Sequence, residues 1–134
     1  MLNKLRKGLR GFGRNSEGGA TVEAVLWIPM FFFIFGLITD VALIFNGHSL
    51  IMRTIQDANR NYSVGRLTTE SAAKAWIEAK LDNLAPNANA TVTEYAGVVT
   101  TVVVVPATDL EALGMFDVIN NLEITVTSQH FIEY

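Results

Sequence analysis

Two carboxylates pose the main chemical question in this chain of 134 residues. Glu23 directly precedes the apolar window Ala24–Phe45, in which Asp40 is the only charged residue. A carboxylate is costly to bury alone in hydrocarbon, but an opposite charge on an adjacent subunit can compensate it when helices bundle. We expect Glu23 to pair in this way, with an interfacial acid near lipid headgroups as the alternative. Asp40 either reaches the polar interface or meets a partner helix.

Other residue types give little support for catalysis. The chain has no cysteine, which excludes disulfides, thiolate catalysis and zinc–thiolate sites. His48 and His130 are the only histidines, and neither has neighbours at metal-ligand spacing. No nucleophile elbow, phosphate-binding loop, dinucleotide fingerprint or calcium loop is present. We therefore expect no enzyme activity, no cofactor and no metal.

The apolar window has the length of a membrane span. As a helix, Ala24–Phe45 reaches roughly 33 Å, about the thickness of a hydrocarbon core. A secretory signal peptide is the competing interpretation, but its apolar core is normally shorter, and the best cleavage site here, Gly47-His48-Ser49, is weak. The window favours a single-pass anchor.

Charge differs on the two sides of this window. Acidic residues outnumber basic ones after residue 46, whereas the first 22 residues are strongly basic. Those basic residues are Lys4, Arg6, Lys7, Arg10 and Arg14. Because flanking cations stay on the cytoplasmic side, we expect the N-terminus inside and the C-terminal part exported. The basic cluster lacks aromatic interleaving, so we interpret it as a topology signal that meets anionic lipid, with no nucleic-acid partner.

The pattern divides the chain into three parts. Residues 1–18 form a basic, glycine-containing leader, and residues 19–45 form the transmembrane half of a long helix. Residues 46–134 form an extracytoplasmic α+β domain that includes the amphipathic half of that helix, in which apolar residues recur at helical spacing up to residue 62.

Further elements are predicted inside the exported part. Gly65 is a plausible stop for the long helix, and Thr68 or Thr69 a cap for a second helix that ends before Pro86. Strands are expected over 90–95 and 98–105, joined at Ala96-Gly97, and over 122–128 or slightly longer. Thr108 and Glu111 form a capping-box pattern for a short helical turn. The predicted fold is α+β, with the long helix packed on a small antiparallel sheet of about three strands and a second helix.

The first half of the chain resembles a known family. Gly18 is followed by "GATVE" and the apolar run, an arrangement similar to the signal sequence of type IV pilins and pseudopilins. The stretch "ATVEAVLWIPMFFFIFGLITDVALIF", followed by "RTIQDANRNYSVGRL", resembles the TadE-like branch, the minor pseudopilins of tight-adherence (Tad/Flp) pilus systems. The resemblance covers roughly residues 14–67.

The resemblance implies roles for particular residues. Prepilin peptidase would cut between Gly18 and Gly19, which places Glu23 at mature position five as the assembly residue. Pro29 matches the proline within the span and is expected to kink or loosen the helix, because it removes a backbone donor. Glu23 is followed by Ala24, and a domain follows the helix, which favours a minor subunit over the short major pilin.

The resemblance also implies function and partners. We expect a pilin-like fold and a protein that helps to initiate, prime or cap a Tad/Flp pilus used in adhesion, located in the bacterial inner membrane with a periplasmic C-terminal domain. Its expected partners are other minor pilins, the major Flp-type pilin, prepilin peptidase, the pilus assembly platform and membrane lipid. Three alternatives are an uncleaved single-pass protein with an exported binding domain, an anchored enzyme or ligand-binding domain, and a type II secretion pseudopilin.

Overall fold

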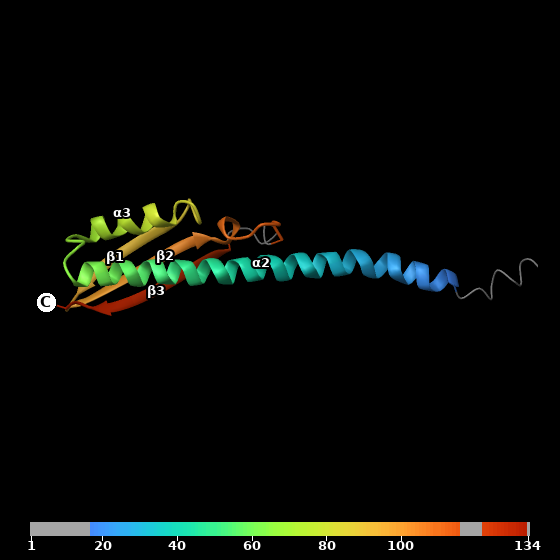
Figure 1. Cartoon of the computed structure of the whole chain (residues 1–134), viewed down its shortest axis with the longest axis horizontal. Coiled ribbons are helices and arrows are strands. Elements are labelled where there is room, and N and C mark those ends of the chain that lie inside the picture. Colours follow the sequence, from blue (N-terminus) through green and yellow to red (C-terminus); the bar gives the residue numbers. More distant parts are fainter. Residues whose placement is uncertain (1–16, 116–121, 134) are drawn as a thin grey trace, which may run out of the picture. The chain divides into compact units, whose positions relative to one another are not determined.

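The computed structural model describes residues 17–115 and 122–133 and has the predicted α+β composition (Figure 1). Its elements in chain order are α2 (Glu17–Ser63), α3 (Glu70–Leu81), β1 (Asn89–Tyr95), β2 (Val98–Pro106), the 3₁₀ helix η1 (Ala107–Asp109) and β3 (Glu123–Phe131). The chain divides after Phe35 into two compact units, and α2 contributes to both.

The first unit contains the N-terminal part of α2, and its large apolar side chains are exposed. Leu26 is 71% exposed and Phe32 73%, and no described residue from Thr21 to Phe35 is buried. From Thr21 onward, α2 is long and apolar enough to cross a membrane. An apolar helix surface of this extent is typical of a segment whose solvent is lipid.

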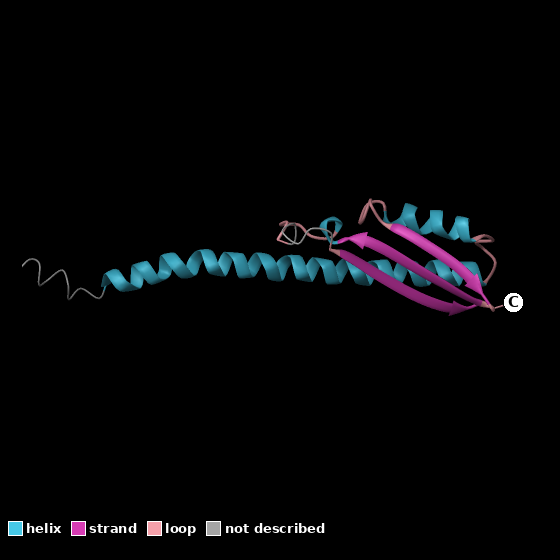
Figure 2. Cartoon of the chain, turned by 180° about the vertical axis from the view of Figure 1, so that it is seen from behind, coloured by secondary structure: helices cyan, strands magenta, loops and turns pink. Residues whose placement is uncertain are grey.

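The second unit is built on a three-stranded antiparallel sheet in the order β1-β2-β3 (Figure 2). The hairpin between β1 and β2 pairs Tyr95 with Val98, so Ala96 and Gly97 form a two-residue turn, as predicted. Both turn residues have positive φ, 52° for Ala96 and 77° for Gly97. This matches the backbone twist that short hairpins require, although alanine is a poor residue for it.

The core lies on one face of the sheet. Alternate residues of β2, from Val99 to Val105, are completely buried, and β1 and β3 contribute Ala90 and Val126 to the same face through their register. The amphipathic half of α2 covers this face, and it lies in front of the strands in Figure 1 and behind them in Figure 2. The remaining core side chains from the two helices include Ile51, Ile55, Ile77 and Leu81.

Both helices end or begin where their capping residues predict. The main-chain N–H of Gly65 donates to the carbonyl of Tyr62, and that of Arg66 donates to Asn61, which is the Schellman pattern with Gly65 at φ 74°. Thr69 caps α3 and accepts a hydrogen bond from the N–H of Ala72 at 3.1 Å. The predicted stop and one of the two predicted caps are therefore confirmed.

The capping-box prediction for Thr108 and Glu111 is wrong. The turn begins earlier, at Ala107, and Pro106 occupies its N-cap position without a side-chain hydrogen bond. The N–H of Ala107 donates a hydrogen bond to the carbonyl of Leu122, next to the last paired residues of β2 and β3. The turn starts at this residue, so Thr108 lies inside η1 and not at its N-cap. Strand pairing therefore sets where the turn starts.

Helix α3 protects an edge of the sheet. The N–H groups of Ala90 and Glu94 in edge strand β1 donate to the carboxylates of Glu78 and Glu70, at 3.1 and 2.8 Å. Unpaired edge groups invite association with other strands, so these contacts close that edge.

Candidate assembly and membrane surface

The predicted processing site lies at the start of α2. Gly18 and Gly19 fall within its first turn, and a Cβ added at Gly19 would meet no atom within 4 Å. The predicted leader, residues 1–18, lies outside the described residues except for its last two. Cleavage between the two glycines stays a prediction.

Glu23 lies on an exposed part of the apolar helix. No hydrogen bond or ion pair joins its carboxylate to another described residue. The nearby apolar side chains of Val22 and Val25 are both more than 60% exposed. A charged group among exposed apolar side chains is the arrangement from which pairing with a neighbouring subunit was predicted.

Pro29 lies inside α2, which continues through it. Proline has no N–H, so the carbonyl of Val25 lacks its usual helical donor at this position. Aromatic residues surround this point, and the rings of Trp27 and Phe31 lie 6.0 Å apart between centroids. The predicted loosening of the helix at Pro29 remains a prediction.

Beyond Phe35 the helix gains a buried stripe. Gly36, Asp40, Gly47, Ile51 and Ile55 are all buried, at spacings of four residues or near-multiples of a helical turn. These positions share one face of α2, and that face packs on the rest of the second unit. From Gly36 to Gly47 the stripe consists of two glycines and a carboxylate. This part of the helix therefore packs through close backbone contact and hydrogen bonds, and not through large apolar side chains.

Asp40 is completely buried, and its partners are main-chain groups of its own domain. Oδ1 accepts hydrogen bonds from the N–H groups of Ala112 and Leu113 at 3.0 and 2.9 Å, and Oδ2 accepts one from Met115 at 2.9 Å. Charge-assisted hydrogen bonds of this kind are among the strongest in proteins. Asp40 therefore fixes the loop from Leu110 to Met115, named here the Asp40 loop, against α2.

The sequence left open a partner helix or the polar interface for Asp40. The structure gives it main-chain partners of a loop in place of a helix, and the interfacial position stays a prediction. Asp40 meets neither a partner helix nor only solvent, because three amides of a loop more than seventy residues later surround it. An uncompensated acid in an apolar window signals that a partner exists. Nothing in the sequence identified Ala112, Leu113 and Met115 as that partner, because main-chain donors carry no residue signature.

Two glycines let the Asp40 loop approach the helix. A Cβ added to Gly36 would lie 2.6 Å from Cε of Met115, and one added to Gly47 would lie 2.7 Å from Cδ2 of Leu110. Gly36 is one helical turn before Asp40, and Gly47 is two turns after it. The loop is therefore held by hydrogen bonds at one position and by close contacts on both sides of it.

A second buried polar residue joins α2 to the sheet. Asn59 is 1% exposed; its Oδ1 accepts the hydroxyl of Thr101 on β2 at 2.6 Å, and its Nδ2 donates to the carbonyl of Ser128 on β3 at 3.3 Å. Sequence reasoning missed this contact, although Asn59 follows Ile51 and Ile55 at four-residue spacing and so falls on the buried face of α2. Asn59 fixes the position of the helix over two strands.

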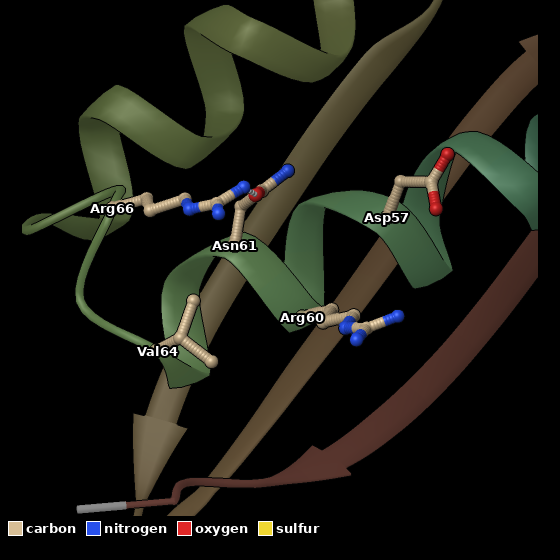
Figure 3. A pocket seen from close by; sticks show the side chains of 5 residues that line it. All are labelled: Asp57, Arg60, Asn61, Val64 and Arg66. Atoms are coloured by element: carbon tan, nitrogen blue, oxygen red, sulfur yellow. Dashed lines mark hydrogen bonds between the residues drawn. The ribbon is translucent and has the colours of Figure 1, made fainter.

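The polar end of α2 carries an open depression of about 640 Å³ (Figure 3). In the figure Arg66 and Asn61 point toward each other, with a 3.5 Å hydrogen bond from Nη1 to Oδ1, whereas Arg60 extends away from this pair. Asp57 and Val64 complete the lining. The charged groups do not converge on one point, so the depression is a solvated helix surface. Among the described residues, no group of three metal-binding side chains occurs.

These features first define a class of protein. A long, exposed, apolar N-terminal helix that continues into a small α+β domain fits a single-pass membrane protein. Residues 18–60 match the family model described as TadE-like protein. The resemblance drawn from the sequence is therefore confirmed over this segment, which includes Glu23, Pro29 and the buried stripe from Gly36 to Ile55. Comparison with curated proteins and with solved structures gives no match.

Proposed function

We propose that this protein is a minor pilin or pseudopilin that assists the initiation, priming or capping of a Tad/Flp pilus used in adhesion. The TadE-like match of residues 18–60 supports a pilus-related protein. The observation that carries the finer proposal is Glu23, a carboxylate on an exposed apolar helix with no partner among the described residues.

The proposed mechanism is assembly rather than catalysis. Before assembly, the apolar part of α2 holds the protein in the inner membrane, with its N-terminus cytoplasmic and its α+β domain periplasmic. Cleavage after Gly18 by prepilin peptidase frees an amine at Gly19. During assembly, apolar helices pack together, and the carboxylate of Glu23 pairs with such an amine on a neighbouring pilin, which compensates both charges as they leave water.

The partners follow from this mechanism. The surface of α2 before Gly36 contacts lipid before assembly and the helices of other minor pilins or the major Flp-type pilin after it. The assembly platform supplies the setting in which this exchange occurs. Pro29, by loosening the helix, lets subunits adjust to different radii in the filament.

The test compares Glu23→Ala with Asp57→Ala in cells that make pili. Asp57 is an exposed carboxylate on the polar part of the same helix, which makes it a matched control. Affinity purification with mass spectrometry should recover partner pilins with the natural protein and with Asp57→Ala, and should lose them with Glu23→Ala. Membrane extraction should be the same for all three. Undiminished recovery of pilins with Glu23→Ala would show that the carboxylate has no role in assembly.

A further inference from the structure

The Asp40 loop packs against α2 between Gly36 and Gly47, at the start of the second unit. Within the second unit, residues exposed near this point include Leu37 (37%), Ile38 (55%) and, on the loop, Leu113 (56%). A Cβ at Gly36 would lie 3.5 Å from Cδ1 of Leu113, so this loop side chain borders the helix one turn before Asp40. Exposed apolar surface of the loop is thus continuous with that of the helix.

The distance along the helix places this junction at the edge of a bilayer. Residues 21–40 of a helix rise about 30 Å, the thickness of a hydrocarbon core. Irregular backbone is not tolerated in contact with hydrocarbon unless its polar groups are satisfied. The three hydrogen bonds to Asp40 satisfy the N–H groups of Ala112, Leu113 and Met115 in this loop.

The charges around the loop agree with an interfacial position. Residues 112–115 carry no charge of their own; in the sequence the nearest acidic residues on either side are Glu111 and Asp117, and the Asp40 carboxylate that contacts the loop is buried. Phe45, which is 68% exposed, follows Asp40 by more than one turn and would lie at the level of the headgroups. A surface of this kind, apolar at one end and polar behind it, is suited to the boundary between headgroups and acyl chains.

We propose that the Asp40 loop is a membrane-surface anchor, in which Asp40 marks the outer boundary of the span and Leu113 inserts among lipids of the outer leaflet. The occupant is lipid, because the exposed apolar surface of the loop continues that of the helix. This inference rests on the membrane anchorage in the proposed function. It moves the outer end of the span from Phe45 to Asp40 and fixes the depth at which the α+β domain sits before assembly.

The absence of cysteine allows a direct test with single-cysteine variants. Leu113→Cys, Phe31→Cys and Thr93→Cys would each be labelled with an environment-sensitive fluorophore in the full chain. Each variant would be reconstituted at low protein content in phosphatidylcholine–phosphatidylglycerol vesicles that contain nitroxide-labelled lipids. Phe31 is exposed on the apolar helix, and Thr93 is exposed on β1 in the domain, so they serve as the lipid and water controls.

We expect deep nitroxides to quench the label at position 31 most strongly and shallow nitroxides to quench the label at 113. The label at 93 should not be quenched by either. If the label at 31 is quenched but the label at 113 is as little quenched as the label at 93, the loop proposal is overturned and the anchor remains. No quenching at 31 would overturn the anchor itself. If the label at 113 is protected from quenching at higher protein content, and its quenching does not depend on nitroxide depth, the surface contacts a second subunit. That outcome would also overturn the lipid proposal.

A further variant tests the role of Asp40 in the same experiment. Asp40→Asn in the Leu113→Cys background keeps the size of the side chain but places an amide against at least one N–H donor of the loop. We expect quenching at 113 by shallow nitroxides to fall while quenching at 31 in the matching Phe31→Cys variant stays unchanged. Equal quenching at 113 with aspartate and asparagine would contradict a positioning role for Asp40.

Discussion

Two carboxylates on helix α2, Asp40 and Glu23, have opposite surroundings. Asp40 accepts three main-chain hydrogen bonds and is fully buried, whereas Glu23 is exposed and bonds to no other described residue. A buried acid with saturated hydrogen bonds contributes to the fold, and an exposed acid among apolar side chains is available to another molecule. The first is therefore structural, and the second is the residue on which the assembly proposal depends.

Removing the Asp40 carboxylate should release the Asp40 loop. Asp40→Ala leaves three amides without their acceptor, and we expect a loss of about 2–4 kcal/mol in the free energy of unfolding of the α+β domain. Hydrogen exchange of the amides of residues 112, 113 and 115, measured by NMR on the full chain in detergent micelles, should accelerate. Asp57→Ala, on the exposed face of the same helix, should leave these rates unchanged. Unaltered exchange in Asp40→Ala would contradict the hydrogen bonding described above.

The hairpin turn offers a stabilising substitution. Ala96 has φ 52°, a conformation that costs an alanine roughly 1 kcal/mol and that asparagine adopts more easily. Ala96→Asn should raise the free energy of unfolding by about 0.5–1 kcal/mol. The β-branched Ala96→Val should lower it by about 1 kcal/mol or more. Thermal unfolding followed by circular dichroism checks both; the same midpoint for the two variants would mean that the turn backbone is not strained.

At the residue scale, the sequence offered either a partner or the polar interface for each acid, and it could not identify the main-chain groups that bind Asp40. Asn59 shows the same limit, because its partners are a threonine and a carbonyl on two strands distant in sequence. Gly65 and Thr69 were predictable because helix ends are determined by local residues.

At the scale of elements, α2 changes its surroundings along its length. Its described residues from Thr21 to Phe35 are not buried, and from Gly36 onward one face is covered by the α+β domain. The order and type of the elements could be read from hydrophobic periodicity and turn residues. The start of η1 could not, because strand pairing at Ala107 overrides the local capping pattern of Thr108 and Glu111.

The two glycines of the buried stripe should respond differently to alanine. Alanine is favoured over glycine in a helix by about 1 kcal/mol, and the one atom closer than 3.4 Å to a Cβ added at Gly36 is the flexible terminal methyl carbon of Met115. Gly36→Ala should therefore be neutral or raise the free energy of unfolding by up to about 1 kcal/mol. At Gly47 three carbons of the buried Leu110 lie within 3.2 Å of the added Cβ, so Gly47→Ala should lower stability by roughly 1–2 kcal/mol.

The change in the free energy of unfolding of each variant is measured by chemical unfolding of the full chain in micelles, with hydrogen exchange of the β2 amides as the probe. The ranking of the two variants is the decisive quantity. Equal stability of Gly36→Ala and Gly47→Ala, or the reverse order, would contradict the close packing of Leu110 on α2.

At the scale of the whole molecule, the described chain combines an apolar helix suited to lipid with a small domain held together without disulfides. The TadE-like match ends at residue 60, before the second helix and the sheet. The matched part therefore contains Glu23 and Pro29, on which the proposals of anchorage and assembly depend. The sheet and the Asp40 loop lie outside the matched segment. For this part of the chain the family resemblance predicted only the general order of elements.

The most direct test of the account is the mature N-terminus of the protein in sheared, purified pili, read by mass spectrometry. Assembly through Glu23 with a cut between Gly18 and Gly19 predicts that the protein is present and that its first peptide begins at Gly19. Protein that retains Met1 and is found only in the membrane fraction, absent from sheared pili, would contradict the account and favour an uncleaved single-pass envelope protein.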